Sequence, residues 1–451
     1  METIVKELDR GWRLTLAPNA QVQADGFDPH TAEELRAGGY PEIPASVPGN
    51  FELDLVAAGL APDPYFAQNP LAFRQYENRH LWYAVSFSAD PMDRQAGELF
   101  LRFAGIDTVA DIWLNGALLG HTENMLIPHE FPVGGKLKAE NELLVHIYPT
   151  TLAARRYPAC AGSRAQRYEY ESLHTRKCAS MFGWDIMPRF VSGGIWRPVT
   201  LVCKPRERFA QFYLYTTAIR AEGAYLVGFY DILTDRDDVR ELTVSLDMVC
   251  GESVLHAADR VWHTNGHLRV TLAQPMLWFP RNAGEPNLYD VTAILRAGDT
   301  VLDERHFRFG IRTAELIRTS TAGEDGSGEF LFRINGKKVY CMGTNWVPLD
   351  AFHSRDRSRL ERTLALLRDS GSNMIRCWGG NVYEDDAFFD FCDENGIMVW
   401  QDFAMGCAVY PQDAELAQEL YREAVSVIHR LRNHASLTLW SGDNEVDAFY
   451  G

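Results

Sequence analysis

The chain has 451 residues, of which 46% are hydrophobic and 23% are charged, as in an ordinary globular protein. A single hydrophobic core stops growing well below this length, so we expect several domains. The formal net charge is −17, from 61 acidic and 44 basic residues, and no basic cluster is long enough to follow a phosphate backbone. This pattern excludes nucleic acid as an expected partner.

The sequence carries no sign of a membrane or metal-dependent protein. Its N-terminal residues lack the basic segment, apolar core and cleavage site of a signal peptide, and no run is long and apolar enough to cross a bilayer. The eight cysteines are scattered without Cys-x-x-Cys pairs or neighbouring histidines, so neither a zinc site nor a disulfide framework is indicated. We therefore expect a cytoplasmic protein with no membrane partner and no bound metal.

Residues 1–204 are predicted to form a β-sandwich of the jelly-roll kind. Short runs rich in β-branched and aromatic residues predict strands at 98–103, 110–114 and 142–147. Asn115 and Gly116 lie between two apolar runs, and this dipeptide suits a type I′ hairpin turn, which needs positive φ at both positions.

Residues 205–315 continue the β pattern with short strands at regular spacing, which favours a smaller, immunoglobulin-like sandwich. The strands are predicted at 211–215, 225–230, 242–246, 267–272, 289–295 and 304–309.

Residues 316–451 change to alternating strands and helices, which is typical of a parallel sheet covered by helices. Strands are predicted at 339–342, 373–378, 397–400 and 437–440, and helices at 358–370, 384–395 and 413–433. An eight-stranded TIM (β/α)8 barrel takes about 250 residues, so these four units predict its N-terminal half, with open edges at the first and last strands. A flexible turn is expected at 324–328.

The last predicted strand is followed by Asn444 and Glu445. In an α/β barrel, catalytic groups sit at the C-terminal ends of the strands. An Asn-Glu pair alone is weak evidence, because Asp443 or Asn444 can simply cap a short helix, with Glu445 favourably placed in its first turn.

The surrounding residues make a stronger case. Residues 430–445 closely resemble the strand-four signature of glycoside hydrolase family 2, which includes β-galactosidases, β-glucuronidases and β-mannosidases. Similar segments follow in family order along nearly the whole chain, at 47–49, 57–65, 82–83, 110–116, 177–198, 275–280, 309–312, 334–346 and 373–380. The opening segments and 177–198 resemble the β-mannosidase branch.

The resemblance implies a retaining glycosidase with Glu445 as general acid/base. Retention needs one carboxyl group that protonates the leaving oxygen and a second that attacks the anomeric carbon, about 5–5.5 Å away. In the family the nucleophile is a glutamate on strand seven, which is expected beyond residue 451. Asn444 would hydrogen-bond the sugar's 2-hydroxyl.

The resemblance also implies residues that bind the substrate. Arg376 would orient the nucleophile, although a surface ion pair is the alternative reading. Trp378 would stack on the sugar, although a tryptophan near a strand is usually part of the core. Trp184 and Asp185 would reach the barrel from the first domain, and Asp402 would either brace the pocket or serve a structural role.

One departure from the family pattern leaves the sugar open. The β-mannosidase motif continues Trp-Asp-Trp-Gly-Pro, whereas Ile186 and Met187 follow Asp185 here. We expect a retaining exo-β-glycosidase that acts on β-mannosides, with a carbohydrate substrate and no metal or organic cofactor. An exo-β-glucosaminidase, a β-galactosidase and an endo-acting β-mannosidase remain alternatives.

A carbohydrate-binding fragment without catalysis is a further alternative for residues 1–451. Because the expected nucleophile lies outside this sequence, we expect the polypeptide alone not to hydrolyse glycosides. Were it active, Asp402 and Glu384 would be the first candidates for a second carboxylate. Homo-oligomerisation is left open.

Overall fold

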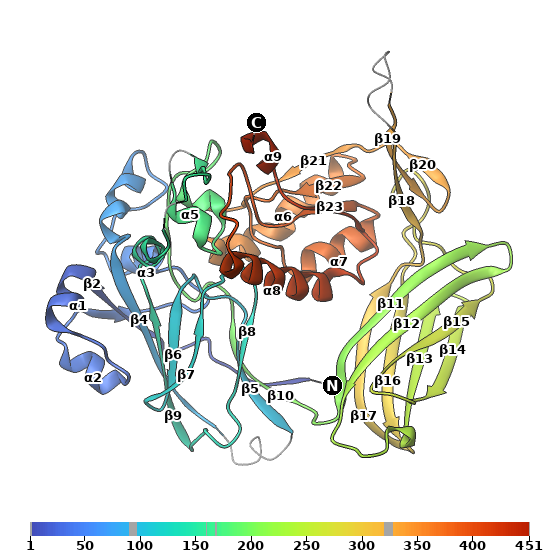
Figure 1. Cartoon of the computed structure of the whole chain (residues 1–451), viewed down its shortest axis with the longest axis horizontal. Helices are drawn as coiled ribbons and strands as arrows, with labels where there is room; N and C mark the ends of the chain where they lie inside the picture. Colours follow the sequence, from blue (N-terminus) through green and yellow to red (C-terminus); the bar gives the residue numbers. More distant parts are fainter. Residues whose placement is uncertain (1, 90–96, 159, 167–168, 320–327, 451) are drawn as a thin grey trace.

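The computed structural model describes residues 2–89, 97–158, 160–166, 169–319 and 328–450. Figure 1 shows two β-sandwiches on either side of an α/β segment that holds the C-terminal part of the chain. Except for Gly328, the turn expected at 324–328 lies outside the described residues.

The first sandwich consists of two antiparallel sheets with strand orders β1-β10-β5-β8 and β3-β2-β4-β9-β6-β7. Its strands are β1 (Thr3–Glu7), β2 (Arg13–Pro18), β3 (Glu42–Pro44), β4 (Arg79–Ser88), β5 (Glu98–Phe103), β6 (Ala110–Leu114), β7 (Ala117–Thr122), β8 (His129–Pro132), β9 (Glu140–Ile147) and β10 (Val199–Lys204). Its helices are α1 (Asn19–Asp25), α2 (Ala32–Ala37), α3 (Phe51–Ala57), α4 (Thr150–Ala153) and α5 (Glu171–His174).

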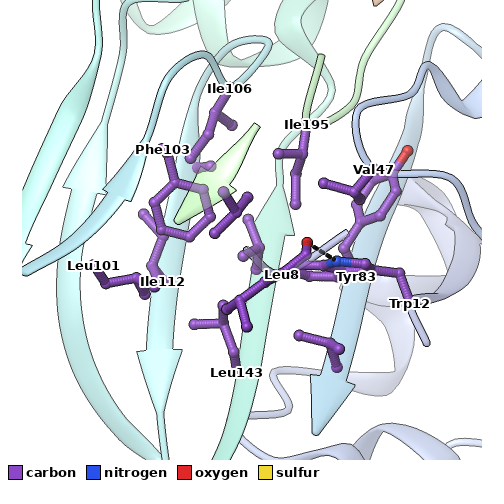
Figure 2. Close-up of a cluster of buried hydrophobic side chains, with 14 of the residues drawn as sticks. Leu8, Trp12, Val47, Tyr83, Leu101, Phe103, Ile106, Ile112, Leu143 and Ile195 are labelled. Carbon is purple, nitrogen blue, oxygen red and sulfur yellow. Dashed lines mark hydrogen bonds between the residues drawn. The ribbon is translucent and has the colours of Figure 1, made fainter. Parts of the chain in front are cut away.

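The core of this sandwich lies between its two sheets. Successive side chains of a strand point to opposite faces, and in β5 this places Leu99, Leu101 and Phe103 inside, each at most 3% exposed. Figure 2 shows such side chains packed together, with Trp12 Nε1 donating a hydrogen bond to Leu8 O at 2.7 Å. Each large apolar side chain buried in this way contributes about 1.5–3 kcal/mol to folding.

The hairpin predicted at Asn115 and Gly116 is confirmed. These residues join β6 to β7 with φ values of 55° and 81°, the left-handed backbone that a type I′ turn requires.

The second sandwich has sheets ordered β11-β12-β15 and β14-β13-β16-β17. Its strands are β11 (Arg208–Arg220), β12 (Gly223–Leu233), β13 (Leu242–Cys250), β14 (Ser253–Arg260), β15 (Asn265–Leu272), β16 (Tyr289–Ala297) and β17 (Thr300–Phe309). Sequence analysis missed β14, since most of its side chains are exposed and it lacks the apolar alternation that marks the other strands.

The α/β segment starts with a small antiparallel sheet and continues as a parallel sheet ordered β21-β22-β23-β24, with helices between its strands. Its strands are β18 (Ala314–Arg318), β19 (Phe330–Ile334), β20 (Lys337–Val339), β21 (Gly343–Trp346), β22 (Met374–Cys377), β23 (Met398–Asp402) and β24 (Leu437–Ser441). Its helices are α6 (Asp356–Asp369), α7 (Asp386–Asn395), α8 (Ala414–Leu431) and α9 (Val446–Tyr450). This succession is that of half a (β/α)8 barrel.

The first parallel strand was predicted wrongly at 339–342. Residue 339 ends the antiparallel strand β20, and the parallel strand β21 starts only at Gly343. Of the side chains that suggested a buried strand, Val339 is buried in β20, but Tyr340, Cys341 and Met342 are exposed, Tyr340 by 83%. Glycine weakens most strands, but a Cβ at Gly343 would collide with Met374 O, so glycine allows β21 to approach β22 closely.

Candidate active site

Three neighbouring parallel strands place polar side chains at one edge of the sheet. The register pairs Arg376 of β22 with Trp400 of β23, and Asp402 of β23 with Ser441 at the end of β24. Because parallel strands end at the same edge, Asn444 and Glu445 follow β24 at the edge that carries Arg376 and Asp402.

Arg376 and Asp402 form an ion pair at this edge. Arg376 Nη2 lies 2.6 Å from Asp402 Oδ2 and Nε lies 3.2 Å from Oδ1, while Gly379 N–H donates to Oδ2 at 3.1 Å. The Asp402 side chain is fully buried, and burial raises the pKa of Asp402 against the opposing effect of Arg376. The Arg376 side chain is 26% exposed and that of Asp402 is fully buried, so the ion pair is partly buried.

Asn444 is held by this ion pair. Its side-chain Oδ1 accepts a hydrogen bond from Arg376 Nη2 at 2.9 Å, and the residue is only 5% exposed. The residue that caps helix α9 is Asp443, whose Oδ1 accepts a hydrogen bond from Val446 N–H at 3.0 Å at the start of the helix. The side chain of Asn444 therefore faces the strand tips.

Glu445 is exposed and has left-handed backbone, with φ of 58°. Its Oε2 accepts a hydrogen bond from Cys407 Sγ at 3.1 Å. A non-glycine residue with positive φ is uncommon and often occurs at functional sites. This conformation turns the Glu445 side chain toward the loop that follows β23.

The loop that carries Trp184 and Asp185 comes from the first sandwich and is anchored on the α/β segment. Cys178 Sγ and Ser180 N–H both donate to Gly380 O, at 3.1 and 3.2 Å. The rings of Trp184 and Trp378 meet edge to face, with centroids 5.1 Å apart and an interplanar angle of 68°. Two residues nearly two hundred positions apart therefore share one contact.

Asp185 and Trp378 differ in how much surface they offer to a ligand. Asp185 is exposed, and its charge acts on the Cys407 thiol, which places the carboxylate near the Glu445 loop. Trp378 is only 8% exposed, so most of its ring is packed against protein. A Cβ at Gly380 would collide with the Trp378 ring, which explains the glycine at that position.

Both candidates for a second carboxylate within this chain are already bound by protein groups. Asp402 is held by Arg376 and Gly379, as described above. Glu384 is 5% exposed and accepts from Trp346 Nε1 at 2.8 Å, and burial raises the pKa of Glu384 to about 7. Both oxygens of Asp402 are bonded to protein groups, whereas Glu384 accepts its hydrogen bonds at Oε1. A nucleophile beyond residue 451 stays a prediction.

A possible cation-binding group lies away from the strand tips. Oxygen and nitrogen atoms of Asp390, Asp393 and His434 come within 4.8 Å of one another, at helix α7 and before β24. His434 Nδ1 already hydrogen-bonds Asp393 Oδ2 at 2.7 Å.

Among the described residues, no helix has the length and apolar character of a membrane span.

Sequence analysis missed two features of the site. Nothing in the sequence distinguished Cys407 from the other cysteines, yet its thiol contacts both Asn444 and Glu445. The ion pair between Arg176 and Glu423 joins the first sandwich to α8. A charged residue within a buried segment is the only local signal that could have indicated such a pair.

Three domain models of one protein family match the chain. The galactose-binding domain-like model of glycosyl hydrolase 2 matches residues 26–197, the model of glycosyl hydrolases family 2 matches 231–312, and its TIM barrel domain model matches 328–451. The chain belongs to glycosyl hydrolases family 2.

Relatives within the family include several β-mannosidases. The chain is 34% identical over 428 residues to β-mannosidase B of Thermothelomyces thermophilus, covering 91% of this chain and 49% of that protein. The crystal structure of β-D-mannosidase from Dictyoglomus thermophilum matches with a TM-score of 0.84 and 32% identity, over 98% of this chain and 52% of that one. The chain thus spans about half the length of these relatives.

A more distant structure supports only the fold. A putative β-galactosidase from Bacteroides fragilis matches with a TM-score of 0.68 at 19% identity, over 97% of this chain and 58% of that one.

Proposed function

We propose that this chain supplies the substrate-binding face and the general acid/base of a retaining exo-β-glycosidase that hydrolyses β-mannosides. The observation that carries the proposal is the cluster at one edge of the parallel sheet, where Asn444 contacts the Arg376–Asp402 pair. Glu445 joins this cluster through Cys407, whose sulfur contacts both Asn444 and Glu445. The similarity to β-mannosidases over nine-tenths of the chain supports the choice of sugar.

The proposed reaction has two steps. A glutamate beyond residue 451 attacks the anomeric carbon, while Glu445 gives its proton to the departing glycosidic oxygen. Glu445, now ionised, then takes a proton from the water that attacks the glycosyl-enzyme bond, and the nucleophile is released. No metal or organic cofactor takes part in these transfers.

The remaining residues are assigned to binding and orientation. Arg376 Nη2 donates to both Asp402 and Asn444, while Nε donates to Asp402, so Arg376 fixes Asn444 for a hydrogen bond to the sugar's 2-hydroxyl. Such a bond strengthens in an oxocarbenium-like transition state. Trp184, Trp378 and Asp185 would contact the sugar from the side of the first sandwich.

The test uses a protein in which this sequence is joined to the rest of its barrel. Aryl β-glycosides that differ only in the sugar would be compared by kcat/KM, and the β-mannoside is expected to be preferred. Glu445→Ala should impair substrates with poor leaving groups far more than activated aryl glycosides, because only the former need a proton in the first step.

A second readout separates the acid from the base role. Added azide should relieve slow deglycosylation in Glu445→Ala, since azide attacks without a general base. An equal loss for all leaving groups, with no response to azide, would contradict the role of Glu445. Preference for another sugar would keep the mechanism and change the substrate.

One observation favours a second candidate within the family. Ile186 follows Asp185 in place of the tryptophan of the β-mannosidase motif, and it is 50% exposed beside the proposed site. An aliphatic side chain offers a sugar less flat apolar surface than an indole ring. The glycoside panel would therefore include β-galactosides and β-glucosaminides.

A further inference from the structure

Cys407 links the loop after β23 to the residues that follow β24. Its backbone N–H donates to Asn444 O at 2.8 Å, and its φ of 44° places it in the left-handed region. The residue is 6% exposed, yet its sulfur reaches the exposed carboxylate of Glu445.

The hydrogen bonds around Cys407 have a defined direction. Arg376 can only donate, so Asn444 must present Oδ1 to it, which leaves Nδ2 facing Cys407 Sγ at 3.2 Å. Because that amide group donates, the sulfur is the acceptor in this contact. The thiol hydrogen is therefore free to point to Glu445 Oε2, 3.1 Å away.

The thiol stays protonated under ordinary conditions. Burial, together with the neighbouring Glu445 carboxylate, raises the pKa of Cys407 to about 12. A neutral thiol is a weak donor, but here it occupies one of the two carboxylate oxygens.

We propose that Cys407 is a positioning residue for Glu445, whose thiol occupies Oε2 and so directs the transferable proton to Oε1. This inference rests on the proposed function. The proton passes from Oε1 to the glycosidic oxygen as the C–O bond breaks, and a proton from the attacking water returns to Oε1. One oxygen thus serves both steps.

The experiment compares three variants in the protein with its complete barrel. Cys407→Ala removes the hydrogen bond, and Cys407→Ser keeps a group that can both donate and accept. Cys392→Ala removes the same atoms from another buried cysteine, in helix α7. The measurement is kcat/KM for aryl β-mannosides over a range of leaving groups, with thermal unfolding recorded for each variant.

We expect Cys407→Ala to lower kcat/KM about tenfold for poor leaving groups, the size of one lost hydrogen bond, and about twofold or less for activated ones. Cys407→Ser should recover most of this loss. Cys392→Ala should show no dependence on the leaving group, whatever its stability.

Two results would overturn the inference: an equal loss for all leaving groups in Cys407→Ala, or a Cys407→Ser variant no better than Cys407→Ala. If Glu445→Ala itself lacks the leaving-group dependence, the proposed function fails and this inference with it. If Glu445→Ala shows the dependence and Cys407→Ala does not, only the role of Cys407 is refuted.

Discussion

The ion pair between Arg176 and Glu423 connects the first sandwich to helix α8, and its loss should destabilise the chain strongly. Both side chains are almost completely buried, 3% and 2% exposed. Arg176 Nε and Nη2 each lie 2.8 Å from a Glu423 oxygen, and Nη2 also donates to Ala404 O. Asn124 and Tyr383 donate to the same carboxylate, at 2.9 and 2.8 Å.

The expected magnitude follows from this burial. Removing one partner leaves the other charge buried without compensation, which costs about 3–5 kcal/mol. We therefore expect Arg176→Met and Glu423→Leu each to lower the free energy of unfolding by about that amount. The double variant should lose clearly less than the sum of both, because no unpaired charge remains.

A matched control lies one helical turn away. Glu419 pairs with Arg422 on the same helix, but that arginine is 57% exposed, so Glu419→Leu should cost no more than about 1 kcal/mol. Urea unfolding at fixed pH, followed by tryptophan fluorescence, would give the differences. Hydrogen exchange of the α8 amides would show whether the loss is local.

Either of two results would contradict a strong, coupled contribution of Arg176 and Glu423 to stability. Single variants that lose less than about 1 kcal/mol would show that the buried charges are solvated after all. Losses that simply add in the double variant would show that Arg176 and Glu423 are not coupled.

Three further predictions concern the site and its surroundings. Asp185→Ala, in a protein with a complete barrel, should raise KM and lower kcat, since contacts to remote hydroxyls contribute to the transition state; unchanged kinetics would exclude Asp185 from binding. Glu384 has a folded pKa of about 7, above that of an unfolded glutamate, so its contribution to stability is full below pH 4.5 and lost as the pH rises to 7. Glu384→Gln should flatten the fall in stability over that window, and an unchanged slope in pH-dependent urea unfolding would count against it. Residues 1–451 alone should not hydrolyse aryl β-mannosides; appreciable turnover, with host glycosidase excluded, would require a second carboxylate within the chain.

Local periodicity predicted the elements that place the candidate site. Short apolar runs predicted β22, β23 and β24, and helical spacing predicted the helices between them. Both patterns depend only on residues close together in the sequence. Once their parallel order is known, the meeting of Arg376, Asp402 and Asn444 follows, because parallel strands end at a common edge. The domain boundaries at 204 and 315, and the roles of the site residues, stay predictions.

What the sequence could not predict depends on contacts between distant residues. Arg176 and Glu423 are 247 positions apart, and no local pattern indicates that their charges meet. Cys407 resembles the other cysteines until Arg376 fixes the direction of the Asn444 amide. In the sequence, Gly343 suggests the end of a strand, and only the carbonyl of Met374 in the neighbouring strand shows why β21 begins with a glycine.

The loop that brings Trp184 to Trp378 lies in a different domain from Glu445. Substitutions that alter substrate binding and substitutions that alter proton transfer therefore fall in different domains. Glu445, the proposed proton donor, follows the barrel strand β24, whereas Asp185 and Ile186 belong to a β-sandwich with its own core. Loops tolerate substitution and length variation better than the strands and helices they connect. Substitutions in this loop, or its replacement by the loop of a relative, could therefore change the substrate preference and leave the proposed catalytic groups of the barrel unchanged.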